Sequence, residues 1–302
     1  MATLQVFDRL VARCRDLPRV PFAVVAPTTE VALSGAVAAE RAGLIQPILV
    51  GNADTVRALA SKLGIDVSAM RLVDAEGDED AARKAVTLCR QGAAMGLMKG
   101  SLHTDVLMHA VLDAKDGLRT ARRVSHVFVI DAPAYPRPLL VTDAAITIYP
   151  TLDEKVDIAK NAIELAHALG IAKPNVAILS AVETVNSKIT STLDAAALCK
   201  MADRGQITGA VLDGPLAFDT AVSAEAAAIK RLVSPVAGAA DVLLVPDLEA
   251  GNMLAKQLEY LGGAELAGVV LGAKVPIVLT SRSDSARARL ASCAVAVLRA
   301  AA

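Results

Sequence analysis

A serine and an arginine stand side by side near the C-terminal end of the sequence, directly after a short apolar run. The run PIVLTS (residues 276–281) predicts a strand that ends at Ser281, and the residues after Arg282 predict a helix. A helix N-terminus after a parallel strand collects unpaired backbone N–H groups and about half a positive charge, so it favours phosphate. The guanidinium of Arg282 could bind two phosphate oxygens at once. The alternative is a capping box formed by Ser281 and Asp284, with Arg282 in solvent.

Two further polar turns follow predicted strands. In PDLEAGN (246–252), Gly251 would let the backbone approach a ligand, whereas the simpler interpretation is a strand-to-helix turn that Asn252 caps. In DGPLAFD (213–219), Gly214-Pro215 is predicted to form a turn, and the aspartates are either helix caps or binding carboxylates. The residues alone leave both alternatives open at each turn.

Motifs that would indicate other chemistry do not occur. The sequence contains no G-x-G-x-x-G after a strand and no G-x-x-x-x-G-K-[ST], so nothing indicates a dinucleotide or a nucleoside triphosphate. It also contains no H-E-x-x-H and no G-x-S-x-G, and its four histidines are scattered, so neither a metal site nor a serine hydrolase is indicated. The four cysteines form no C-x-x-C pair and fall in predicted helices, which predicts reduced structural thiols of a cytoplasmic protein.

Short apolar runs alternate with longer helical stretches along the chain. Each run is rich in Val, Ile and Leu without polar alternation, which is typical of parallel strands covered on both faces. Helical segments separate most of the runs, so the sequence predicts an α/β fold with a largely parallel sheet. The predicted strands are residues 22–27, 47–51, 95–100, 126–131, 175–181, 208–214, 241–247 and 276–281.

A proline marks a predicted boundary in the middle of the chain. Pro150 ends an apolar stretch, and Thr151 can cap the next helix in a capping box with Glu154. Apolar residues then occupy one face of this helix, and Gly170 supplies its stop. We interpret the helix as a bridge into a second domain.

The composition excludes several classes of protein. Of the 302 residues, 54% are hydrophobic but only 2% are aromatic, so Ala, Val and Leu must form the core. The net charge is -1, so the chain has neither the basic field nor the aromatic platforms that nucleic-acid binding needs. No apolar run approaches the roughly 20 residues that span a bilayer, and the N-terminal segment has the spacing of an amphipathic helix, unlike a signal peptide.

Four segments together resemble the phosphate acetyl/butyryltransferase family. Residues 241–285 are similar to its P-x-[IL]-x-[AT]-G-N-x-x-x-K segment and to the S-R signature that follows, and VLDGPLAFDTAVS (211–223) is similar to its D-G-P-L-x-F-D motif. LMKGSLHTDVLMHAVL (97–112) matches a further segment, and RRVSHVFV (122–129) is similar to butyryl-type members. The resemblance covers nearly the whole chain.

The resemblance implies a reaction and the residues that perform it. Family members transfer a short acyl group, from acetyl to butyryl, so that acyl-CoA and phosphate give acyl phosphate and CoA by direct transfer in a ternary complex. Ser281 would donate to the developing oxyanion, and Arg282 would contact the oxyanion and the phosphate. The substrate-binding residues implied by the matching motifs are Asp213, Gly214, Pro215, Asp247, Gly251, Asn252 and Lys256.

One position departs from the acetyl-type pattern. Acetyl-type members carry an aspartate, their catalytic base, seven positions after the serine, where this chain has Ala288. The string S-R-S-D-S is similar to butyryl-type members, so Asp284 is the nearest catalytic carboxylate, with Asp213 and Asp247 as competitors. We therefore expect propionyl- or butyryl-CoA to be used at least as well as acetyl-CoA. The basic cluster Arg119, Arg122 and Arg123 is either a solvated face or a site for CoA phosphates.

The resemblance also implies an architecture. Members have two α/β domains of the isocitrate/isopropylmalate-dehydrogenase-like fold, with largely parallel sheets and the active site in the cleft between the domains. For this chain we expect a first domain of residues 1–150 plus 276–302 and a second, inserted domain of residues 151–275. We expect no metal or redox cofactor, CoA as a substrate, and a cytoplasmic homodimer that binds neither nucleic acid nor membrane.

Two other functions stay open. A metal-dependent dehydrogenase of the same fold would need clustered metal ligands and a nicotinamide site, and the sequence carries neither signature. A non-catalytic two-domain ligand-binding protein would normally bring a helix-turn-helix or a secretion signal, and the N-terminal residues show neither. Phosphate-dependent thiol release from acyl-CoA distinguishes the three functions.

Overall fold

The computed structural model describes residues 6–280 and 284–302, which form two compact units. The terminal unit consists of residues 7–122 and 267–302, and the inserted unit consists of residues 123–266 with Val6. The predicted α/β fold with largely parallel strands is confirmed in both units.

The strands of the terminal unit are parallel except at one edge. Their order is β3 (Arg71–Asp74), β2 (Ile45–Gly51), β1 (Val20–Val25), β4 (Gly96–Lys99), β11 (Ile277–Val278) and β10 (Glu265–Leu271), with β10 antiparallel to β11. The register pairs Val25 with Lys99 and Met98 with Val278. The carboxyl ends of β1, β4 and β11 therefore meet at one edge of the sheet.

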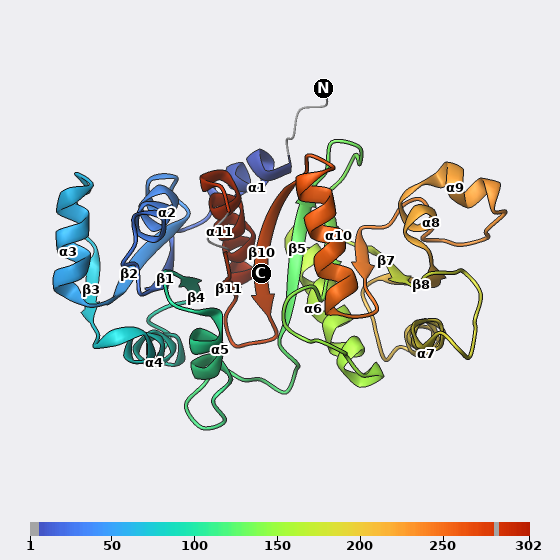
Figure 1. Cartoon of the computed structure of the whole chain (residues 1–302), viewed down its shortest axis with the longest axis horizontal. Coiled ribbons are helices and arrows are strands. Elements are labelled where there is room, and N and C mark those ends of the chain that lie inside the picture. Colours follow the sequence, from blue (N-terminus) through green and yellow to red (C-terminus); the bar gives the residue numbers. More distant parts are fainter. Residues whose placement is uncertain (1–5, 281–283) are drawn as a thin grey trace. The chain divides into compact units, whose positions relative to one another are not determined.

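Helices cover both faces of this sheet. They are α1 (Val6–Cys14), α2 (Glu30–Arg41), α3 (Ala53–Lys62), α4 (Gly77–Arg90), α5 (Thr104–Leu112) and α11 (Ala286–Ala301). Of these helices, α2, α4 and α11 are rich in alanine. Within the unit, α2 packs against α11 on one face, and α4 packs against α5 on the other (Figure 1). Small side chains allow this close packing: α2 buries Ala32, Ala36 and Ala39.

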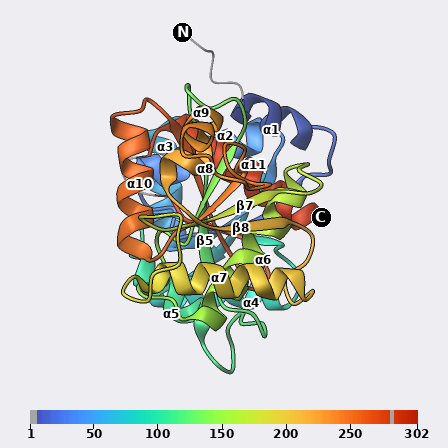
Figure 2. The same ribbon diagram turned by 90° about the vertical axis from the view of Figure 1, so that its right-hand side faces the viewer.

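The strands of the inserted unit follow the order β5 (Ser125–Asp131), β6 (Leu139–Thr142), β9 (Val242–Leu244), β7 (Asn175–Leu179) and β8 (Val211–Leu216). Only β5 and β6 pair in antiparallel fashion among them. The helices are α6 (Leu152–Ala168), α7 (Thr190–Asp203), α8 (Phe218–Val222), α9 (Ala224–Ile229) and α10 (Leu248–Tyr260). Within this unit, α7 lies on one side of β7 and β8, and α8 and α9 lie on the other (Figures 1 and 2).

The predicted start of α6 is confirmed, but the helix does not mark a boundary between the units. Thr151 Oγ1 accepts a hydrogen bond from the Glu154 N–H, and Glu154 Oε2 accepts one from the Thr151 N–H, which completes the capping box. The units divide after residues 122 and 266, whereas the sequence placed the divisions after residues 150 and 275. The reason is that β5 and β6 precede Pro150 yet pair with each other and with β9.

Two local predictions differ from the structure. The segment around Gly214-Pro215 was expected to be a turn, but β8 continues through it to Leu216, with an irregular register beside β7. The C-terminal helix was expected to begin directly after Arg282, but α11 begins at Ala286 and its N-cap is Ser285. The list of predicted strands also lacks β3 and β6, which are only four residues long, and β10, which has seven residues.

No helix in the described ranges is both long and apolar enough to cross a membrane.

Candidate functional site

A pocket opens at the carboxyl edge of the terminal unit, where β1, β4 and β11 end. In open α/β sheets, ligands bind beyond the carboxyl ends of the strands. The volume of this pocket is about 320 Å³. Its described lining consists of Thr29, Val31, Ala32, Lys99, Gly100, Ser101, Thr280 and Arg289.

A glycine allows the strand ends to approach each other. The N–H groups of Gly100 and Ser101 donate to the carbonyl oxygens of Val25 and Ala26, both at 2.8 Å. A Cβ atom at Gly100 would lie 2.3 Å from the Val25 oxygen, so any other residue would push β4 away from β1. The loop after β4 is thereby held against the loop after β1.

The N-terminus of α2 contributes backbone N–H groups to the same pocket. Its N-cap residue is Thr29, whose side chain makes no capping hydrogen bond. Ser101 Oγ instead connects the two loops, because it accepts from the Thr28 N–H at 3.2 Å and donates to Thr29 Oγ1 at 3.0 Å. Helix N-termini carry a partial positive charge, so this wall of the pocket attracts an anion.

Two buried cationic side chains line the pocket as well. Lys99 is 7% exposed, and its Nζ atom donates to the carbonyl oxygen of Leu102 at 3.0 Å. Arg289 is 5% exposed and donates from Nη1 to Thr280 Oγ1 at 2.8 Å. None of the described lining residues is acidic. The arrangement therefore suits a small anion such as phosphate.

The predicted catalytic pair follows this pocket in the chain. Ser281 and Arg282 lie outside the described residues, but Thr280, directly before them, lines the pocket. Asp284 is half-buried and precedes the N-cap residue Ser285. Because Ser285 Oγ accepts from the Ala288 N–H at 3.0 Å, the cap of α11 is not Ser281.

Several predicted substrate-binding residues gather at the carboxyl end of β9 in the inserted unit. Asp247 caps α10 by accepting from the Ala250 N–H at 2.9 Å. Asn252 Nδ2 donates to the Ala144 carbonyl oxygen at 3.2 Å, so the cap is Asp247, not Asn252. A Cβ atom at Gly251 would lie 2.8 Å from Val245 Cγ2, so this glycine serves close packing.

Lys256 follows one turn later on α10. Its Nζ atom lies 2.8 Å from Glu259 Oε2 and 5.6 Å from the centre of the Tyr260 ring. These contacts hold the side chain along its own helix.

A buried carboxylate organises the loop that Asn252 contacts. Asp143, 2% exposed, accepts hydrogen bonds from the N–H groups of Ala145, Ile146 and Thr147 at 3.0–3.1 Å. Burial raises the pKa of Asp143, although these hydrogen bonds act in the opposite direction. The carboxylate thus fixes the turn that presents the Ala144 carbonyl oxygen to α10.

The remaining predicted substrate residues lie elsewhere in the inserted unit. Asp213, Gly214 and Pro215 belong to β8, which is separated from β9 by β7. Asp213 Oδ1 accepts from the Gly214 N–H at 2.9 Å, and a Cβ atom at Gly214 would lie 2.7 Å from the Ile178 carbonyl oxygen. Within this unit the structure brings Asp247, Gly251 and Asn252 together but not the residues of β8.

Two members of the arginine cluster, Arg119 and Arg123, make separate contacts. Arg123 forms an ion pair with Glu154 at 3.1 Å, and its N–H donates to Asp157. The backbone of Arg119 pairs with Ala273, just before β11 and so at the amino end of that strand. Arg119 therefore lies at the opposite edge of the terminal sheet from the anion pocket.

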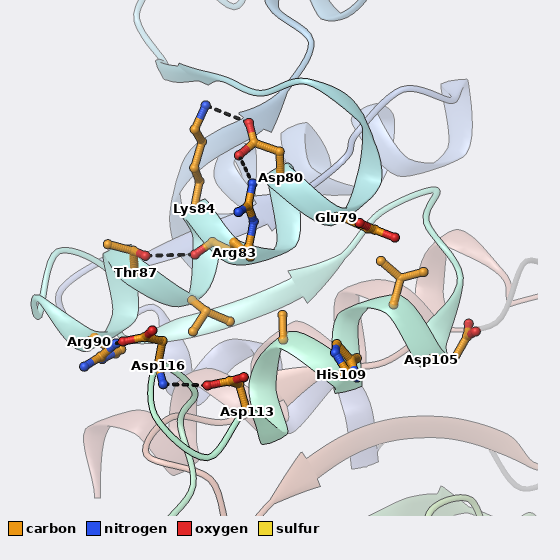
Figure 3. A pocket seen from close by; sticks show the side chains of 13 residues that line it. Glu79, Asp80, Arg83, Lys84, Thr87, Arg90, Asp105, His109, Asp113 and Asp116 are labelled. Carbon is orange, nitrogen blue, oxygen red and sulfur yellow. Dashed lines mark hydrogen bonds and ion pairs between the residues drawn. The ribbon is translucent and has the colours of Figure 1, made fainter.

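A larger hollow between α4 and α5 has the wrong charge for an anion. Its volume is about 1070 Å³, and Figure 3 shows the charged side chains that line it. The cations are held by carboxylates: Arg83 and Lys84 each lie 2.7 Å from Asp80, and Arg90 lies 2.6 Å from Asp116. The acidic residues of the lining are Glu79, Asp80, Asp105, Asp113 and Asp116. They would repel a phosphate, so its greater size does not make this hollow the site.

No set of three His, Cys, Asp or Glu side chains gathers as a metal site in the part of the chain that the structure describes. The four cysteines are free thiols. Burial raises the pKa of Cys14 to about 11 and that of Cys89, Cys199 and Cys293 to about 12. They are therefore poor nucleophiles at neutral pH.

Sequence reasoning missed Lys99, Ser101, Thr280 and Arg289 as pocket residues. A signal was present for the first two, because K-G-S stands at the end of a buried apolar run, and a lysine at the carboxyl end of a parallel strand lies at the ligand edge. Arg289 gave no such signal, since only the packing of α11 directs it to Thr280.

The family model described as "Phosphate acetyl/butaryl transferase" matches residues 78–297. The phosphate acetyltransferase of Rhizobium meliloti is 58% identical over 98% of this chain and 93% of its own length. The phosphate butyryltransferase of Clostridium acetobutylicum is 41% identical over 98% of both chains. The crystal structure of a branched-chain phosphotransacylase from Enterococcus faecalis V583 has a TM-score of 0.82 and 31% identity, covering 93% of this chain and 99% of its own.

These matches extend over almost all of the sequence, including both polar turns and the S-R string that follows the pocket residue Thr280. The chain therefore belongs to the phosphate acetyl/butyryltransferase family.

Proposed function

We propose that this protein is an acyltransferase that converts acyl-CoA and phosphate into acyl phosphate and CoA. The observation that carries the proposal is the anion pocket at the ends of β1, β4 and β11, directly before the S-R string. Its positive charge suits phosphate. The names of two relatives, phosphate acetyltransferase and phosphate butyryltransferase, describe the transfer of an acyl group to phosphate. The acyl group is a short one, from acetyl to butyryl.

In this proposal the residues after the pocket perform the chemistry. Ser281 donates to the oxyanion that forms when phosphate attacks the thioester, and Arg282 binds the phosphate and the oxyanion. Capping does not compete for Ser281, because Ser285 caps α11. Asp284 remains the nearest carboxylate for taking the CoA thiol proton in the reverse reaction.

The inserted unit supplies the substrate-binding residues of the proposal. Asp247, Gly251 and Asn252 share the N-terminal part of α10, with Lys256 one turn further on. The other predicted residues lie on β8, and they are Asp213, Gly214 and Pro215. In this proposal β8 and α10 contact different parts of the CoA molecule.

We also propose that the protein works as a homodimer in the cytoplasm. Met253 and Tyr260, seven residues apart on α10, are exposed apolar side chains that a second copy could cover. Free thiols are typical of a reducing compartment. Light scattering on the purified protein tests the dimer, and a monomer at micromolar concentration contradicts it.

Thiol release tests the activity directly. We expect phosphate-dependent release of CoA thiol from acetyl-, propionyl- or butyryl-CoA, at a rate that a chelator does not change, because the proposed chemistry needs no metal. The string S-R-S-D-S and Ala288 favour propionyl- or butyryl-CoA over acetyl-CoA, and comparing kcat/KM for the three decides this. Absence of thiol release above a phosphate-free control, or its loss with chelator, would show that the proposal is wrong.

A further inference from the structure

We propose that Lys99 is a catalytic residue of the acyl transfer, whose ammonium group binds the attacking phosphate. The inference rests on the proposed function and deepens it by assigning a role to a side chain outside the S-R string. It starts from the juxtaposition of a buried lysine, a helix N-terminus and a buried arginine in one pocket.

A lysine is a costly residue at this position. Lys99 ends β4, whose residues Gly96–Lys99 are all buried, and removing an ammonium group from water is costly. A methionine or leucine would fill the same strand position without that cost. The carbonyl oxygens of Leu102 and Gly100, at 3.0 and 3.5 Å, hold the ammonium group in place.

The neighbours of Lys99 indicate which kind of ligand its positive charge would bind. Val31 and Ala32, in the first turn of α2, line the same pocket, so a bound anion meets both the ammonium group and the helix N-terminus. Arg289 adds a second positive charge, and the hydroxyl groups of Ser101 and Thr280 complete the lining. A doubly charged oxyanion is the ligand that matches this charge and this set of donors.

The chemistry of the transfer gives Lys99 a defined task. An oxygen of hydrogen phosphate forms a bond to the acyl carbon, and the carbon–sulfur bond breaks with its electron pair going to sulfur. The proton of hydrogen phosphate ends on the CoA thiolate, so the products are acyl phosphate and CoA thiol. Lys99 takes no part in this proton transfer and holds the phosphate in position for attack. Its loss should therefore impair the use of phosphate and not the binding of acyl-CoA.

The test replaces Lys99 and varies each substrate separately. We expect Lys99→Met to lower kcat/KM for phosphate by about 10- to 100-fold, the usual effect of one hydrogen bond to a charged group, with the KM for acyl-CoA unchanged. Lys99→Arg, which keeps the charge, should recover part of the loss. Lys274→Met is the matched control, because Lys274 is an exposed lysine at the opposite edge of the same sheet, and it should behave as the wild type.

Calorimetric titration with inorganic phosphate supplies a readout that does not depend on turnover. The wild type should bind phosphate, and Lys99→Met should bind it at least tenfold more weakly. A folded Lys99→Met variant with wild-type phosphate affinity and KM overturns the inference, as does an equal loss for both substrates.

The experiment also distinguishes failure of the proposed function from failure of a variant to fold. If the wild type releases no thiol from any acyl-CoA, the proposed function fails, while the titration still decides whether Lys99 binds phosphate. If Lys99→Met does not fold, Lys99→Gln, which keeps a donor for the carbonyl oxygens, replaces it. If neither variant folds, Lys99 serves the fold and the inference is wrong.

Discussion

At the scale of the residue, two nearby serines have different roles, one structural and one proposed to be chemical. The S-x-x-D string allowed Ser281 to be a helix cap, yet Ser285 makes the capping hydrogen bond to Ala288. The cap and the proposed oxyanion donor are therefore two different serines, four positions apart. Each can be removed without removing the other.

Ser281→Ala should reduce kcat by about 10²–10³, the usual cost of losing one oxyanion donor. The thermal midpoint should stay near that of the wild type, because Ser281 does not cap α11. Both quantities are measured on the same preparation.

Arg282→Lys keeps the charge but loses the planar guanidinium that can bind two oxygens at once, so it should raise the KM for phosphate.

Ser285→Ala is the matched control for this prediction. It should reduce the free energy of unfolding by about 1 kcal/mol, the usual effect of a lost N-cap, with activity per folded molecule intact. A Ser281→Ala variant that melts lower but turns over normally would move the active site toward Asn252 and Lys256.

At the scale of the element, helix ends decide where the chain turns. The capping box of α6 was readable because its two partners are three residues apart and both hydrogen bonds are local. Glu154 has a second task that is not local, since its carboxylate also pairs with Arg123, 3.1 Å away, just before β5. The start of α6 is thus tied to the strand that opens the inserted unit.

Thr151→Ala should lower the free energy of unfolding by about 1 kcal/mol, because the Glu154 N–H loses its acceptor. For a unit of this size the thermal midpoint should fall by about 2–4 °C. Thr190→Ala, at an exposed residue that begins α7, is the control and should leave the midpoint unchanged. Equal midpoints for the two variants would show that the box contributes nothing measurable.

At the scale of the whole molecule, a buried imidazole couples stability to pH. His126 on β5 is 1% exposed, its Nδ1 atom has no hydrogen-bond partner among the described residues, and its ring packs edge-on against Phe128 at 4.4 Å. Burial lowers the pKa of His126 from 6.5 to about 3. The folded protein therefore keeps this side chain neutral at pH values where the unfolded chain takes up a proton.

Because the pKa of His126 is lower in the folded state, its contribution to the free energy of unfolding is fully present above about pH 6.5. This contribution is lost as the pH falls toward 3. At pH 5 the loss should be about 2 kcal/mol. Urea unfolding of the wild type and of His126→Asn gives the free energy of unfolding at pH 7 and pH 5. The loss due to His126 is the difference between the two proteins in how much this free energy falls from pH 7 to pH 5. Asp143, whose pKa is raised, acts in the opposite direction, and this comparison cancels its effect.

His103→Asn is the control for the pH experiment, because His103 is exposed at the start of α5. This variant should follow the pH dependence of the wild type. Parallel curves for His126→Asn and the wild type would contradict the prediction.

The sequence by itself determined the alternation of strands and helices, the capping of α6 and the family, because each depends on residues close together in the chain or on motifs read in order. It could not place the division between the units, since pairing of β6 with β9 joins residues about a hundred positions apart. The same limit applied to the anion pocket. Thr29, Lys99 and Arg289 meet only because Gly100 lets β4 approach β1 and α11 packs beside them. Only tertiary packing brings such side chains to one strand edge, and that packing decided which cations the site contains.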